Sequence, residues 1–169
     1  TKSLKAGPYY CIAPTSVWYT KQWPPEKWIE LIEKLPQDRK VYLIGSPDDK
    51  EACERIRKKV VRDEVHNTAG DLGLMDSAAL IADAERLFVN DSAPLHLASA
   101  LNTPTTAVFC STVPRFGFGP LASDSKIAEV GQELYCRPCG MHGYKSCPEG
   151  HFRCAWEIGV EEVVGETGG

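Results

Sequence analysis

Short apolar runs alternate with segments of helical periodicity along most of this chain, and this alternation constrains the fold more than any other feature. The first run covers residues 9–13 and the second covers 40–44. Between them lie apolar side chains at helical spacing, which are Trp28, Leu31, Ile32 and Leu35. Because both strands are apolar throughout, this strand–helix–strand unit indicates parallel strands buried on both faces.

The same alternation continues to residue 130. Further strands are predicted at 64–69, 86–90, 105–110 and 126–130, and further helices from Asp48 to Lys59, at 74–84 and at 92–101. Because each crossover between parallel strands is right-handed and lays its helix on the sheet, the pattern predicts a doubly wound, Rossmann-like α/β fold. The expected strand order is 3-2-1-4-5-6.

This pattern divides the chain into two regions. Residues 1–130 are expected to form the sheet domain, and residues 131–169 a cysteine-rich segment packed on the same domain. The last residues, 165–169, carry no apolar side chain and are expected to fray.

Composition and missing motifs exclude several classes of protein. The chain has 169 residues and a formal net charge of -4, which argues against a domain whose main partner is nucleic acid. No stretch approaches the ~20 apolar residues of a transmembrane helix, and the start lacks the order of a signal peptide, so a cytoplasmic protein without a transmembrane segment is expected. Dinucleotide-binding and P-loop glycine motifs are both absent, which disfavours dehydrogenases and P-loop ATPases.

The two most polar loops fall where a ligand is expected. In this strand order, a ligand binds beyond the carboxyl ends of the first and fourth strands. The loops after these strands hold Thr15, Ser16 and Lys21, and then Asp91, Ser92 and Ala93 with His96 one turn later. Backbone N–H groups at the helix start after Asp91 would bind a phosphate, and Lys21 would neutralise a diphosphate.

Each of these residues also has a plainer interpretation. Asp91 and Ser92 are typical of an ordinary helix N-cap, His96 of a partly buried histidine, and Lys21 of a solvated surface charge. Only their conjunction at one crevice favours a pyrophosphate site.

The second and third strand ends would hold the rest of a nucleotide. Asp48 offers a carboxylate for ribose hydroxyls, and Leu72 an apolar contact for the base. Ordinary turns are the alternative, in which Asp48 caps the following helix and Glu51 answers it three residues later.

At these residues the sequence resembles the family 9 glycosyltransferases, the heptosyltransferases that build the inner core of bacterial lipopolysaccharide. The matching pieces are Lys21-Gln22-Trp23-Pro24, 43–46, 67–70, Asn90-Asp91-Ser92-Ala93-Pro94-Leu95-His96 with Leu97 and Ala98, 105–109 and 112–116. Members of this family have two Rossmann-like domains facing a cleft, the GT-B arrangement, and the matching half is the C-terminal one, which binds ADP of the sugar donor.

The resemblance implies roles for individual residues. Thr15, Ser16, Lys21 and the backbone of 91–93 would contact the phosphates, with His96 nearby, and Asp48 would bind the ribose. The chain departs from the family at Ala93, where many members have glycine, and the spacing before Lys21 leaves either Thr15 or Ser16 as the contact.

The resemblance also implies an incomplete enzyme, because the family's general base lies in an N-terminal, acceptor-binding domain that has no counterpart here. The expectation is an ADP-heptose-binding half that has no catalytic residue of its own, transfers no sugar alone and requires no cofactor for catalysis. The complete enzyme would act on a lipid-linked saccharide acceptor, in the cytoplasm or peripherally at the inner membrane. A non-catalytic nucleotide-binding module, and a glycosyltransferase that uses another nucleotide sugar, remain alternatives.

Four of the seven cysteines crowd near the end of the chain: Cys136, Cys139, Cys147 and Cys154. A Cys-x-x-Cys turn can place two thiolates on one ion, so these four residues are candidate ligands of a structural zinc. Disulfides and free thiols are the alternatives.

Overall fold

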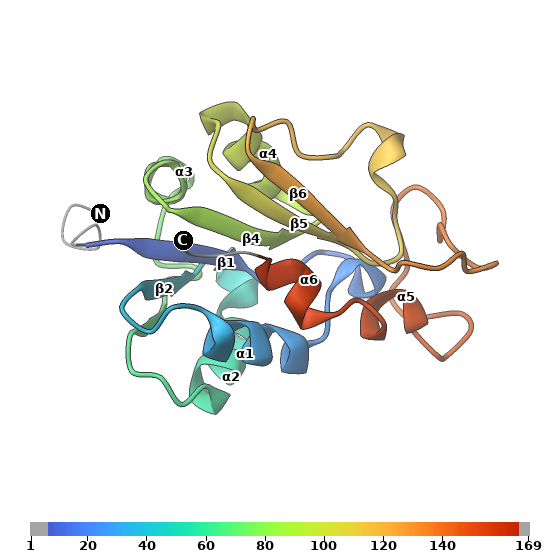
Figure 1. Cartoon of the computed structure of the whole chain (residues 1–169), viewed down its shortest axis with the longest axis horizontal. Coiled ribbons are helices and arrows are strands. Elements are labelled where there is room, and N and C mark those ends of the chain that lie inside the picture. The colour runs from blue at the N-terminus through green and yellow to red at the C-terminus, as the bar shows by residue number, and fades with distance from the viewer. Residues whose placement is uncertain (1–6, 166–169) are drawn as a thin grey trace.

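The computed structural model describes residues 7–165, which form one six-stranded parallel sheet with helices on both faces (Figure 1). The sheet order is β3-β2-β1-β4-β5-β6, as the sequence predicts. The strands are β1 (Tyr9–Ala13), β2 (Lys40–Leu43), β3 (Val65–Asn67), β4 (Arg86–Asn90), β5 (Thr105–Phe109) and β6 (Ser125–Glu129). The expectation for the chain beyond Gly165 lies outside the described residues.

The helices cover the sheet in two layers. They are α1 (Pro25–Lys34), α2 (Lys50–Lys59), α3 (Leu74–Ala82), α4 (Ala93–Leu101), α5 (Arg153–Trp156) and α6 (Val160–Val164), with 3-10 turns η1 (Tyr19–Lys21), η2 (Pro47–Asp49) and η3 (Pro114–Phe116). Figure 1 shows α3 and α4 on one face of the sheet and α1, α2 and α6 on the other. Within residues 7–165, no helix is long and apolar enough to cross a bilayer.

Two hydrophobic cores follow from alternating side chains on the strands. In β1, Cys11 joins the core under α3 and α4, whereas Ile12 joins the core under α1, α2 and α6. Every residue of β1 and of β5 is buried. This explains why these strands read as continuous apolar runs rather than as alternating ones.

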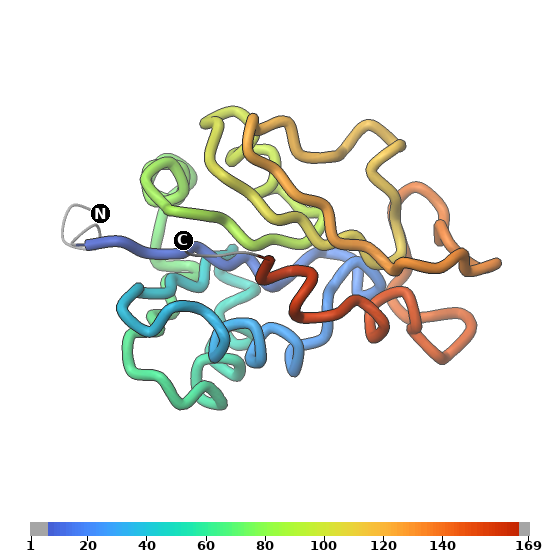
Figure 2. The backbone as a smooth tube through the Cα atoms, in the orientation of Figure 1, coloured from blue at the N-terminus to red at the C-terminus, as the bar shows by residue number. Residues whose placement is uncertain are grey.

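Apolar side chains of residues 131–165 belong to the core under α1, α2 and α6. Leu134, Phe152, Ile158 and Val163 pack with Trp28 and the other residues under α1. Figure 2 shows this part of the chain, in orange and red, running from β6 back across the α1 side of the sheet.

Strand β3 is shorter than the predicted 64–69, because its last residue starts a turn. The Asn67 side-chain oxygen accepts the N–H of Ala69 at 3.1 Å, which is an Asx turn. Gly70 follows with a φ of 77°, a conformation that ends the strand.

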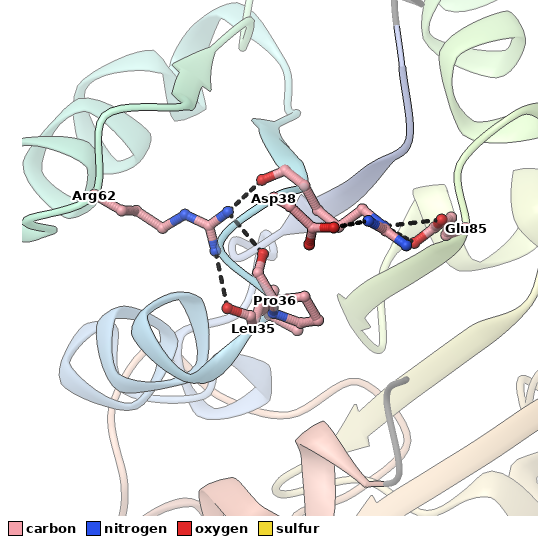
Figure 3. A network of polar contacts seen from close by, with 6 residues as sticks. Leu35, Pro36, Asp38, Arg62 and Glu85 are labelled. Atoms are coloured by element: carbon pink, nitrogen blue, oxygen red, sulfur yellow. Dashed lines mark hydrogen bonds and ion pairs between the residues drawn. The ribbon is translucent and has the colours of Figure 1, made fainter. Parts of the chain in front are cut away.

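An arginine network closes the amino-terminal edge of the sheet (Figure 3). Arg62 donates to the carbonyls of Leu35, Pro36 and Arg39, and thereby satisfies backbone groups between the end of α1 and the start of β2. Burial lowers the pKa of Arg62. The polar loops lie at the opposite, carboxyl edge of the sheet, where a cavity opens.

Candidate functional site

A cavity of about 620 Å³ opens at the carboxyl ends of β1, β2 and β4. Six of the predicted site residues line it: Thr15, Ser16, Asp48, Leu72, Ser92 and Ala93. They come from four separate loops, so the fold brings together residues that lie far apart in the sequence. Ile44, Ile81 and Leu97 add an apolar surface to the same cavity.

The N-terminus of α4 faces this cavity without a side-chain cap. Ser92 occupies the N-cap position in an extended conformation (φ -155°), but its side chain does not cap the helix. Its hydroxyl donates instead to the carbonyl of Asn90 at 3.3 Å. In the first turn of α4, Pro94 has no N–H and the N–H of Leu95 donates to the carbonyl of Ser92 at 3.1 Å, so the N–H of Ala93 is the group that can meet an anion. The helix dipole favours negative charge there.

The Asp91 carboxylate is committed to a buried ion pair rather than to the helix. Its Oδ2 lies 2.7 Å from Lys21 Nζ and also accepts the hydroxyl of Thr112 at 2.7 Å. The two charged side chains are only 13% and 6% exposed, so Lys21 is not a solvated surface charge. A buried pair with this extra hydrogen bond holds the ammonium group in one place.

This ion pair adjoins the cavity but does not line it. Ser16, which does line the cavity, donates its hydroxyl to the backbone carbonyl of Asp91 at 3.3 Å. Two of the three N–H groups of the Lys21 ammonium have no part in the pair with Asp91 and can serve another acceptor.

The loop that carries Lys21 is fixed by contacts that the sequence did not reveal. Gln22 donates its side-chain amide to the carbonyl of Ser16 at 2.7 Å, and the N–H of Trp23 donates to Asn90 Oδ1 at 3.0 Å. Thr112, Gln22 and Asn90 were all missed as site residues. A polar residue within or directly after an apolar strand run, such as Asn90 or Thr112, is the signal that could have found two of them.

His96 lies outside the cavity lining. It is exposed on α4, and its ring makes an edge contact with Phe118 at a centroid separation of 6.2 Å. Ala93 and Leu97, on the same helix, both line the cavity, whereas His96 is not among the residues that line it.

Where the turn after β2 borders the cavity, the predicted capping arrangement is wrong. The carboxylate of Asp49, not Asp48, accepts the N–H and the hydroxyl of Ser46, at 2.8 and 2.6 Å. The physical reason is Pro47, whose fixed φ suits the first helical position, so that the turn begins directly after Ser46.

Asp48 and Glu51 therefore do not form the capping box at this turn, which Ser46 and Asp49 form instead. Glu51 pairs with Arg55 at 2.7 Å on the exposed side of α2. Asp48 is exposed on the wall of the cavity, which Leu72 also lines.

The four clustered cysteines are electrostatic neighbours. Burial, and then the neighbouring thiols of Cys136 and Cys147, raise the pKa of Cys139. Burial, and then Cys139 and Cys147, raise the pKa of Cys154 to about 12. All are free thiols, and among residues 7–165 no three His, Cys, Asp or Glu side chains are already arranged to hold a metal ion.

A profile of glycosyltransferase family 9 (heptosyltransferase) matches residues 1–147. The chain belongs to this family. It is 31% identical over 135 residues to lipopolysaccharide heptosyltransferase 1 of Pseudomonas aeruginosa, a match that covers 79% of this chain and 36% of that protein. The chain spans about a third of the length of the curated relatives it matches.

Solved structures of heptosyltransferases share the fold of this family 9 chain. The structure of Escherichia coli ADP-heptose lps heptosyltransferase II matches with a TM-score of 0.79 and 24% identity, covering 96% of this chain and 47% of the other. Escherichia coli heptosyltransferase WaaC with ADP matches with a TM-score of 0.63 and 27% identity, covering 72% and 38%. The predicted α/β class and GT-B half are confirmed.

Proposed function

We propose that this chain is the donor-binding half of a heptosyltransferase and that its cavity takes ADP-heptose. The observation that carries the proposal is the uncapped N-terminus of α4 beside the buried Lys21–Asp91 pair, at one end of a cavity that is otherwise partly apolar. A helix N-terminus and a held ammonium group are what a diphosphate needs. The ADP bound to the related WaaC is consistent with the same ligand class.

The proposed ligand lies along the cavity from the phosphate end to the nucleoside end. Its phosphates would contact Lys21, Thr15 or Ser16, and the backbone N–H groups after Asp91. Asp48 would accept ribose hydroxyls, since the carboxylate of Asp49 is already engaged by Ser46.

The base would lie against Leu72 and the apolar side chains of Ile44 and Leu97, which line the same cavity. Residues 131–165 would be part of the same donor domain, because their apolar side chains share its core. His96 stays outside the proposed contacts because its ring lies against Phe118.

In the complete enzyme, this half would steady the departing ADP. As the bond from heptose to phosphate breaks, negative charge grows on the diphosphate, and Lys21 and the start of α4 bind it more tightly than they bind the donor. The proposal therefore needs no catalytic metal. A general base in a separate acceptor-binding domain would take the proton of a lipid-linked saccharide hydroxyl, in the cytoplasm at the inner membrane.

Calorimetric titration with ADP, UDP and GDP tests the donor assignment. ADP is expected to bind more tightly than the other two, and Lys21→Ala to weaken it about 10- to 100-fold, the range for one charge-assisted contact to phosphate. Lys58→Ala, an exposed lysine on α2, is the matched control. Tighter binding of UDP or GDP would mean that the donor carries that nucleotide instead of ADP. Absence of binding to all three would overturn the proposal.

We also propose that Cys136, Cys139, Cys147 and Cys154 bind a structural zinc ion. Four thiols in one short stretch of chain suit a soft, tetrahedral metal, and binding would require them to turn toward a common point and lose their protons. Because binding displaces protons from the thiols, loading should weaken as the pH falls.

Elemental analysis of the purified chain for zinc and iron tests this second proposal, since thiolates bind both metals. About one metal ion per chain is expected, with loss in Cys147→Ser and retention in Cys53→Ala, whose thiol lies on α2. A metal-free protein, or a mass lowered by a disulfide, would overturn it.

A further inference from the structure

The residue before Lys21 is held by Tyr144 of the cysteine-rich segment and by Ser111 in the loop after β5. Thr20 is 1% exposed, and its hydroxyl oxygen accepts the N–H of Tyr144 at 2.7 Å and lies 3.0 Å from the hydroxyl of Ser111, which donates to it. The backbone N–H of Thr20 donates to the carbonyl of Tyr144 at 3.1 Å, and its carbonyl accepts the N–H of Ser111 at 3.2 Å. Every polar atom of Thr20 is therefore bonded to one of these two residues.

Gly143 packs directly against the same place. A Cβ at this position would lie 2.8 Å from Thr20 Oγ1, 3.1 Å from Ser111 Oγ and 3.4 Å from Lys21 Cγ. Its φ of 75° also favours glycine. Gly143 thus lies against Thr20 and beside the Lys21 side chain, where there is no room for a further side chain.

The start of this stretch, Arg137 and Cys139, is fixed to the loop after β5, which supports the partner of Lys21. Arg137 donates to the carbonyls of Cys110 and Thr112, each at 2.7 Å, and the N–H of Cys139 donates to the carbonyl of Ser111 at 2.8 Å. Thr112 in turn donates to Asp91. Residues 137–144 therefore contact the loop of Lys21 directly, and they reach Asp91 only through Thr112 in the loop after β5.

A long lysine side chain loses binding strength when its stem is free to rotate. The side chain has much rotamer entropy, and a site that confines the stem before the ligand arrives does not lose this entropy on binding. Thr20 and Gly143 confine the stem in two ways. The hydrogen bonds of Thr20 fix the backbone next to Lys21, and Gly143 lies beside the Cγ of Lys21.

We propose that Thr20 and Gly143 are positioning residues of the phosphate site and act on a bound diphosphate through Lys21. This inference rests on the proposed function, since it assumes that Lys21 meets the diphosphate. It assigns the cysteine-rich segment a task in ligand binding that its sequence does not suggest.

The experiment compares ADP with adenosine, which lacks the phosphates. Gly143→Ala and Thr20→Val are expected to weaken ADP about 5- to 20-fold and to leave adenosine unchanged, which is the scale of one misplaced charged contact. Thr20→Ser retains the hydroxyl and should bind ADP like the wild type. In the Lys21→Ala background, the effect of either variant should vanish, because coupled residues are not additive.

Gly150→Ala is the matched control for strain. Gly150 has a φ of 72°, and a Cβ there would meet nothing within 4 Å, so the variant carries similar backbone strain without a contact to Thr20 or Lys21. Thermal melting checks that each variant is folded, and if Gly143→Ala does not fold, Thr20→Val and Thr20→Ser decide.

Three outcomes would overturn the inference. Equal losses for adenosine and ADP would mean a general structural role, and losses that persist in the Lys21→Ala background would mean that Lys21 is not the intermediary. If ADP binding depends on Lys21 but not on Thr20 or Gly143, only the positioning role is wrong. If the wild type binds no ADP, the proposed function is wrong and the inference falls with it.

Discussion

The two ends of the cavity are built in opposite ways. At the phosphate end, the charges of Lys21 and Asp91 are buried and share a hydrogen-bond network with Thr112. At the nucleoside end, the ion pair between Lys50 and Asp71 is more than half exposed on both side chains. A buried charge is stabilised by its partner, whereas an exposed charge is stabilised mainly by water. Single substitutions should therefore change the free energy of unfolding far more at the phosphate end.

The largest effect is expected for Asp91→Ala. It removes the acceptor of both Lys21 and Thr112 and leaves a buried ammonium group without a counter-charge, which should destabilise the fold by about 3 kcal/mol. For a chain of this length, that corresponds to a fall in Tm of about 6–12 °C in calorimetry.

Asp71→Ala is the matched variant at the nucleoside end. Because the pair with Lys50 is exposed, the loss should be below about 1 kcal/mol. Similar losses from the two aspartate variants would refute the contrast between the two ends.

A smaller effect is expected for Thr112→Val, which keeps the shape of the side chain and removes only the hydroxyl. Loss of a hydrogen bond to a buried carboxylate should cost about 1–2 kcal/mol in a denaturant titration. An unchanged midpoint would mean that Thr112 does not support the ion pair.

At the nucleoside end, Leu72→Ala should weaken ADP and adenosine by the same factor, about 3- to 10-fold, because only apolar contact is lost. Because Leu72 also packs against the core under α3 and α4, the variant should lose some stability, and thermal melting checks that it is folded. Met75→Ala is the control in the same calorimetric titration, since Met75 is 79% exposed and does not line the cavity. A loss confined to ADP would place the phosphates, not the base, beside Leu72.

The smallest effect concerns Glu54, which supports β3 below the nucleoside end. Hydrogen bonds from Arg57 and then Asn67 lower its pKa to about 2. Its stabilisation is therefore present above the unfolded value of 4.5 and is lost as the pH falls toward 2.

Comparison of the wild type with Glu54→Gln across this pH range measures the contribution. The difference in free energy of unfolding should stay below about 1 kcal/mol at pH 7, because the group is partly solvated, and should disappear near pH 2. A difference that grows on acidification would contradict the sign.

Much of this molecule could be predicted because its core is periodic. Continuous apolar runs such as 9–13 and 105–110 identified the parallel strands, and the strand order then placed the loops of Thr15 and Asp91 together. The position of Asp48 was predicted, but not the capping role of Asp49, since Pro47 moves the start of the turn. His96 was predicted near the phosphates, and its ring contacts Phe118 outside the lining of the cavity.

The contacts of the cysteine-rich segment could not be predicted. Gly143 and Tyr144 lie in a stretch without periodicity, and their partner Thr20 is 124 residues away from Tyr144. Hydrogen bonds between loops leave no periodic pattern in the sequence. The sequence around Thr20 therefore does not predict Tyr144 as its partner, and the sequence around Tyr144 does not predict Thr20.

The separation between Thr20 and Tyr144 also sets an order of events during synthesis. A chain emerging from the ribosome can pair β1 with β2, and later with β4, long before Tyr144 has been made, because these contacts need only earlier residues. Contacts of such high sequence separation are the slowest to form. Lys21, which follows Thr20, is therefore translated long before Tyr144 and gains this support only after Tyr144 has been made. A nascent chain can thus complete the sheet before it completes the proposed phosphate site.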